Sequence, residues 1–128
     1  MDTRATIASI LDRAYTARRT NDAAAAATVF APDGQFGANG APPATQLAER
    51  ANAIASMFEN FRVVAYTEHC RIIDPPRAVV HWRGRFRLKN GREGETDVLD
   101  LIEIRDGKIA ALTTFFDTAY ASALGAPA

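Results

Sequence analysis

The chain has 128 residues, a length that suits one domain with a buried core, and 48% of its residues are hydrophobic. Its 15 basic residues balance its 15 acidic ones. This balance argues against nucleic acid and against an anionic membrane surface as partners, so we expect a small apolar molecule or another protein. We predict a single domain over residues 1–128.

The N-terminal segment "MDTRATIASILDRAYTAR" carries charges throughout, which is not the pattern of a signal peptide or a membrane span. The single cysteine, Cys70, has no partner for an internal disulfide and lies in an apolar, strand-like run, where a buried thiol is expected. Together these features predict a protein of a reducing compartment, the cytoplasm.

The first half of the chain has the pattern of three helices. An amphipathic helix ending before "TND" (20–22) is predicted by the helical spacing of Ile7, Ile10, Leu11, Ala14, Tyr15 and Arg18. Asn21 or Thr20 is a suitable N-cap for a second helix, "DAAAAATVF" (22–30), which Pro32 stops. The segment "PDGQFGANGAPP" (32–43) is rich in glycine and proline and allows at most a short strand around Phe36.

Thr45 is a suitable N-cap for the third helix. The apolar face of that helix is predicted to contain Leu47, Ala51, Ile54, Phe58 and Phe61. The pattern then changes to period two in "RVVAYTEHCRII" (62–73), "AVVHWRGRFRL" (78–88) and the hairpin "TDVLDLIEIRDGKIAALTTFFD" (96–117). A last short helix, "DTAYASALG", has Asp117 as its N-cap and Gly125 as its stop. The fold class is therefore α+β, with a curved antiparallel sheet wrapped around three N-terminal helices.

One carboxylate interrupts the apolar face of the first hairpin strand. Asp100 shares that face with Val98 and Ile102, because side chains alternate along a strand. Such apolar neighbours desolvate a carboxyl group and raise its pKa. Asp100 is thus either a hydrogen-bond donor or general acid in a pocket, or a structural carboxyl satisfied by a backbone amide or an arginine.

The turn at "RDGK" determines which residues of the last strand accompany Asp100. A two-residue Asp106-Gly107 turn would place it with Ala111, Thr113, Phe115 and Asp117. A three-residue turn with Gly107 left-handed in a bulge would instead place it with Leu112, Thr114 and Phe116.

The order of elements resembles the nuclear-transport-factor-2-like superfamily, with its cystatin-like cone and central pocket. Within it, the segments "VFAPDGQF", "DVLDLIEIRDGKI" and "FFDTAYASALG" are similar to SnoaL-like and ketosteroid-isomerase-like proteins. The resemblance implies a homodimer that pairs through the outer face of the sheet. It also implies that Asp100, in "DVLD", stays protonated and donates a hydrogen bond to a developing oxyanion.

The resemblance also implies the rest of the site, and we favour the second register of the last strand because the resemblance places pocket residues at Leu112, Thr114 and Phe116. The isomerase oxyanion tyrosine falls on Ala14, and the neighbouring Tyr15 is the candidate to assist Asp100. The candidate substrate-binding residues are Phe36, Phe58, Trp82, Phe86, Val98, Leu112, Thr114 and Phe116. The isomerase base aspartate falls in "GAN", where Ala38 and Asn39 supply no carboxylate. Authentic ketosteroid isomerase activity is therefore not predicted.

The other polar groups are weak candidates for chemistry. His69 and His81 have no partner at metal-ligand spacing, so neither a metal nor another cofactor is expected. His81 alternates with the apolar residues of its strand, and together with His69 and Asp117 it is a poor candidate for a general base. The basic stripe is expected to be solvated or to contact a subunit, and it consists of Arg83, Arg85, Arg87 and Lys89.

We therefore predict a cofactor-independent isomerase, cyclase or dehydratase-like enzyme that acts on a small, mostly apolar molecule, either carbonyl-containing or polycyclic. The general base is unidentified. Two alternatives remain open. A ligand-binding protein without chemistry is favoured by the missing carboxylate at Ala38 and Asn39, and a protein-interaction module would use the arginine stripe.

Overall fold

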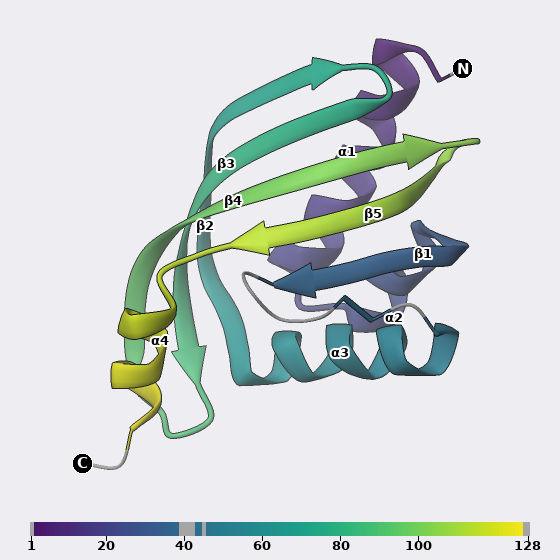
Figure 1. Cartoon of the computed structure of the whole chain (residues 1–128). Coiled ribbons are helices and arrows are strands. Elements are labelled where there is room, and N and C mark those ends of the chain that lie inside the picture. Colours follow the sequence, from purple (N-terminus) through teal and green to yellow (C-terminus); the bar gives the residue numbers. More distant parts are fainter. Residues whose placement is uncertain (1, 39–42, 45, 127–128) are drawn as a thin grey trace.

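A computed structural model describes residues 2–38, 43–44 and 46–126. The predicted α+β order is confirmed (Figure 1). In chain order the elements are α1 (Arg4–Arg19), α2 (Ala23–Thr28), β1 (Phe30–Ala38), α3 (Leu47–Asn60), β2 (Phe61–Asp74), β3 (Arg77–Leu88), β4 (Glu93–Arg105), β5 (Lys108–Phe115) and α4 (Thr118–Gly125). None of the described helices is long and apolar enough to cross a membrane.

The strands form one curved sheet in the order β1-β5-β4-β3-β2, with α1, α2 and α3 on its inner side (Figure 1). Strands β2 to β5 are antiparallel, as expected, but β1 pairs in parallel with β5, so the sheet is mixed. The prediction of only a short strand around Phe36 was wrong. Pro32 is tolerated because it lies on an edge strand, in the irregular stretch between the paired residues Phe30 and Gln35.

The second helix is shorter than predicted. Asp22, and not Asn21 or Thr20, is its N-cap and accepts a hydrogen bond from the Ala25 N–H. The helix ends at Thr28, before Pro32, because Phe30 already belongs to the sheet. Asn21 is left-handed, with φ of 58°, and its side-chain amide bonds both the N–H and the carbonyl of Val63 in β2. It thus joins the turn between α1 and α2 to the sheet.

The third helix buries Ile54 and Phe58 of the predicted apolar face, but Ala51 of that face is exposed. Its N-cap is Gln46, while the predicted cap Thr45 lies outside the described residues. Leu47 is exposed, and the buried row at a spacing of four consists of Arg50, Ile54 and Phe58. Arg50 is 2% exposed, and its Nη1 donates to the carbonyls of β1, at 2.9 Å from Ala31 and 2.8 Å from Gly34. The buried guanidinium therefore anchors β1 to α3.

The hairpin has the predicted register for an unpredicted reason. Asp106 and Gly107 both have positive φ, 52° and 75°, and form a two-residue turn of type I′ between Arg105 and Lys108. The pairing shifts between Glu103 and Ile104, which leaves Ala110 as an extra residue in β5. Because of this bulge, Asp100 pairs with Thr114.

Cys70 is exposed, so the prediction of a buried thiol was wrong. It pairs with His81, whose alternation with Trp82 and Val80 places both residues on the outer face of the sheet. A thiol on this face of the edge strand β2 has no layer above it in the described chain.

The buried Arg50 gives a test of the fold. Replacing Arg50 by alanine leaves the carbonyls of Ala31 and Gly34 unpaired, and we expect a loss of about 2–4 kcal/mol in the free energy of unfolding, measured by urea denaturation. The matched control is Arg19→Ala, at an exposed position of α1, which should change it by less than about 0.5 kcal/mol. Equal losses in the two variants would contradict the anchoring role.

Candidate functional site

A cavity lies between the concave face of the sheet and the helices, with about 100 Å³ of space for the centres of water molecules. Every helix and every strand of the fold contributes to its lining, which is predominantly apolar. All ten predicted site residues line this cavity, namely Tyr15, Phe36, Phe58, Trp82, Phe86, Val98, Asp100, Leu112, Thr114 and Phe116. The structure therefore brings the predicted residues together, and it provides a site in which an apolar ligand can be enclosed.

Gly84 allows the aromatic part of this lining to form. The rings of Trp82 and Phe86 lie on the inner face of β3 with centroids 5.6 Å apart. A Cβ at Gly84, between them in sequence, would lie only 2.5 Å from the Phe86 ring and 2.6 Å from the Trp82 ring. The missing side chain lets the two rings meet along the cavity wall.

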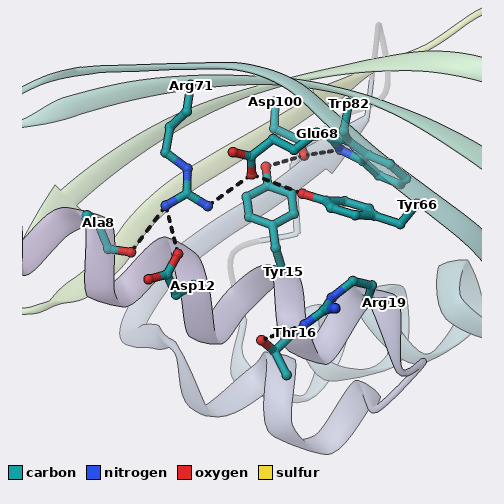
Figure 2. A network of polar contacts seen from close by, with 10 residues as sticks. All are labelled: Ala8, Asp12, Tyr15, Thr16, Arg19, Tyr66, Glu68, Arg71, Trp82 and Asp100. Carbon is teal, nitrogen blue, oxygen red and sulfur yellow. Dashed lines mark hydrogen bonds and ion pairs between the residues drawn. The ribbon is translucent and has the colours of Figure 1, made fainter.

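Asp100 is the polar centre of the cavity and is only 5% exposed. Its Oδ2 accepts hydrogen bonds from the Tyr15 hydroxyl at 2.5 Å and from the Trp82 indole N–H at 2.9 Å (Figure 2). The Thr114 hydroxyl is a third side-chain partner. Helix α1 and three adjacent strands therefore converge on one carboxyl group, which fixes its position in the apolar wall.

Burial decides the protonation of this group. Desolvation raises the pKa of Asp100, while hydrogen bonds from Tyr15, Thr114 and Trp82 and the charge of Arg18 act in the opposite direction and only partly offset it. The pKa of Tyr15 is raised well above its ordinary value by burial, then by the charge of Asp100 and the hydrogen bond to it. Tyr15 is thus a neutral hydroxyl donor at physiological pH.

A second polar network supports the wall behind Asp100. Tyr66 packs on Trp82 with ring centroids 5.1 Å apart and donates to Glu68 (Figure 2). Glu68 pairs with Arg71, which pairs with Asp12 of α1, both at 2.9 Å. These contacts connect β2 to the helix that carries Tyr15.

The sequence analysis missed Arg18 as a site residue. Arg18 lines the cavity at 9% exposure, and its Nη2 donates to the Phe61 carbonyl at 3.0 Å. Its guanidinium carbon lies 4.5 Å from the centre of the Phe58 ring. Burial lowers the pKa of Arg18 to about 10, an effect that the nearby Asp100 opposes. The signal was present in the sequence, because Arg18 continues the apolar stripe of the first helix.

Asp100 is the only carboxylic acid among the described residues that line the cavity, and no histidine lines it. His69 is exposed, and His81 pairs with Asp97 on the outer face at 3.1 Å. Asp117 is the N-cap of α4, as predicted, and accepts from the Tyr120 N–H. Asn39, in the expected base segment, lies outside the described residues. Within the described chain, no three His, Cys, Asp or Glu side chains gather as metal ligands would.

A family model, the SnoaL-like domain, matches residues 11–112, which include most of the cavity. The chain belongs to this family. A comparison with curated proteins finds no match.

Solved structures share this SnoaL-like fold. The "Putative SnoaL-like polyketide cyclase" from Jannaschia sp. CCS1 is 15% identical, with a TM-score of 0.83 and 100% and 99% of the two chains covered. The "Putative Isomerase" from Bacillus subtilis is 12% identical, with a TM-score of 0.85 over 98% and 96%. A ketosteroid-isomerase-like protein from Catenulispora acidiphila, in complex with trimethylamine, is 16% identical, with a TM-score of 0.79 over 92% and 93%. At these identities the likeness establishes the fold.

The raised pKa of Asp100 predicts a specific pH dependence of stability. The unfolded chain loses this proton near its ordinary pKa of about 4, whereas the folded protein keeps it to higher pH. The Asp100 contribution is therefore complete below about pH 4 and is lost as pH rises towards the folded pKa. We expect the free energy of unfolding of the wild type, minus that of Asp100→Asn, to fall as pH rises from about 4 to 8, measured by urea denaturation.

The control for the loss of one carboxylate is Asp106→Asn, because Asp106 is exposed and asparagine tolerates its left-handed backbone. If the difference in the free energy of unfolding between the wild type and Asp100→Asn is constant or grows with pH, the charged form of Asp100 is not disfavoured in the folded protein.

Proposed function

We propose that this SnoaL-like protein binds a small, mostly apolar molecule, carbonyl-containing or polycyclic, in the cavity. We propose further that it acts on the molecule as a cofactor-independent isomerase, cyclase or dehydratase-like enzyme. The observation that carries the proposal is the single buried carboxyl group, Asp100, held by Tyr15 and Trp82 in an otherwise apolar wall.

Asp100 would act on the oxygen of the substrate. When a proton leaves the carbon next to a carbonyl, negative charge develops on the carbonyl oxygen. A neutral Asp100 has one O–H to donate to that oxygen, and this bond strengthens as the charge develops. In a cavity that excludes water the gain is larger than in solution, because the donor is already oriented.

Tyr15 and Trp82 support this role from the other side of the carboxyl group. Both donate to Oδ2 and hold Asp100 in a fixed orientation. We propose that Tyr15 assists by positioning Asp100, and that its own hydroxyl stays uncharged because its pKa is raised. The similarity of the fold to structures named as a polyketide cyclase and an isomerase supports this class of reaction.

A ligand-binding protein without chemistry is the second candidate. It is favoured by one observation, which is that the described lining contains no carboxylate or imidazole other than Asp100 to act as a separate base. Such a protein would bind the same ligands through the same carboxyl group and release them unchanged.

The proposal is tested with 2-naphthol, a planar phenol that mimics an enol oxygen on an apolar ring. We expect the wild type to bind it and Asp100→Leu to bind it about 10-fold to 100-fold more weakly, because the variant loses the polar partner in a desolvated site. Calorimetric titration between about pH 5 and pH 9 measures how the affinity changes with pH.

The matched control is Asp97→Leu, which removes an exposed aspartate from the outer face of the same strand and should leave binding unchanged. Binding to Asp100→Leu at the wild-type affinity would remove the proposed role of Asp100, and absence of binding to the wild type would refute the cavity as a site for such ligands.

We also propose that two copies pair through the outer face of the sheet. Leu99, Leu101 and Phe115 are exposed there by 43%, 45% and 41%, and Leu99 and Phe115 are direct cross-strand neighbours. The arginines of the predicted basic stripe do not offer free charge on this face. Arg85 and Arg87 pair with Glu93 at 2.8 Å, and Arg83 pairs with Asp97 at 3.2 Å. An apolar patch beside neutralised charges suits a subunit contact.

Light scattering at micromolar concentration should therefore show a dimer for the wild type and a monomer for Leu101→Arg, since each dimer would bury two unpaired charges. Leu47→Arg, which replaces an exposed leucine on α3 instead, should remain dimeric. A monomeric wild type, or a dimeric Leu101→Arg, would exclude this interface.

A further inference from the structure

Arg18 presents an unused hydrogen-bond donor within the cavity. Its Nη1 is buried and has no hydrogen-bond partner in the described chain, although the side chain lines the cavity. Its other terminal nitrogen, Nη2, already donates to the Phe61 carbonyl. A buried donor without an acceptor is costly in a folded protein, and at a cavity wall it marks the place where a ligand oxygen can bind.

The positive charge of Arg18 also has no ion-pair partner among the described residues. With a pKa of about 10, the guanidinium remains protonated at neutral pH. The ion pairs between described residues do not include Arg18, and burial raises the pKa of Asp100, the acid that lines the cavity, so its charged form is disfavoured as a partner. The aromatic rings of Phe58 and Phe86, at 4.5 and 5.6 Å, give the cation only partial compensation.

Arg50, the other buried arginine, has a structural role and serves as a comparison. Nη1 of Arg50 donates to the carbonyls of Ala31 and Gly34, and Arg50 does not line the cavity. Arg50 also leaves one buried nitrogen, Nε, without a partner, but that atom belongs to a residue outside the lining. Among the residues that the structure describes, only Arg18 combines an unpaired terminal nitrogen with a position on the cavity.

We infer that Arg18 binds the carboxylate of the ligand, so that the ligand class is a small apolar carboxylic acid whose ring contacts the aromatic wall. This inference rests on the proposed function in so far as it uses the same cavity. It specifies the ligand further, with an anionic group at Arg18 and a carbonyl or enol oxygen at Asp100. A carboxylate supplies both the missing acceptor and the missing charge.

The test compares two probes of nearly the same shape, trans-cinnamate and trans-cinnamamide. Trp82 is the single tryptophan of the chain and lines the cavity, its ring centre 6.0 Å from the Arg18 guanidinium carbon, so its fluorescence reports binding. For the wild type we expect cinnamate to bind about 10-fold to 100-fold more tightly than cinnamamide, the range of a charge-assisted hydrogen bond at a desolvated site.

Three variants assign this preference to Arg18. Arg18→Met keeps an unbranched, flexible side chain and removes the guanidinium with its charge, so it should lose the preference for cinnamate over cinnamamide. Arg18→Lys keeps a cation and should retain part of the preference. Arg19→Met removes the neighbouring exposed arginine and should behave as the wild type. Circular dichroism checks the fold, and Arg18→Gln replaces Arg18→Met if the latter does not fold.

Equal binding of the two probes to the wild type, or a preference that survives in Arg18→Met, would overturn the inference. Titration with 2-naphthol separates this failure from failure of the proposed function. If the wild type binds 2-naphthol through Asp100 but shows no preference for cinnamate, the role of Arg18 is refuted and the proposed binding of ligands at Asp100 is retained. If the wild type binds none of the three probes, both proposals fail.

Discussion

The site depends on one extra residue in β5. A two-residue turn at Asp106 and Gly107, followed by regular pairing, would place Thr113 opposite Asp100 and turn Thr114 to the outer face. The bulge at Ala110 reverses the alternation of the last strand, so that Leu112, Thr114 and Phe116 line the cavity. One unpaired residue thus decides which of the alternating side chains of β5 line the cavity and which face outwards.

Two ionisable groups, one acidic and one basic, share this apolar space, and burial disfavours the charged form of both. Burial raises the pKa of Asp100 and lowers that of Arg18, so each group is disfavoured as an ion. Asp100 has donors around it in the protein, whereas Nη1 of Arg18 has no acceptor. A protein selected for stability alone would do better with apolar residues at these positions, and the ligand that we propose would account for the presence of both groups.

Membership of the SnoaL-like family determines the fold, whereas the chemistry depends on the side chains that line the cavity. In this chain the lining has one acid, one buried cation and a set of aromatic rings. Its outer face has an apolar patch beside arginines that are already paired with acids of the neighbouring strand. The inner face is therefore suited to a ligand, and the outer face to another protein surface.

The sequence alone determined the fold class and the position of Asp100 on the apolar face of its strand beside Val98 and Ile102, because alternation along a strand and helical spacing are local properties. It also determined the end of α1 before Thr20 and the N-cap of α4 at Asp117. Only the tertiary structure decided the parallel pairing of β1 with β5, the bulge at Ala110 and the burial of Arg18 and Arg50. Those features depend on partners far away in the chain. Pro32 needs a position at the edge of the sheet, and the extra residue in β5 depends on the pairing with β4. The two guanidinium groups depend on carbonyls or aromatic rings of other elements. A local pattern can indicate such a position, as the apolar stripe of the first helix does for Arg18, but it does not decide the burial, since an arginine on an apolar stripe is equally compatible with an exposed side chain until the surrounding elements enclose it.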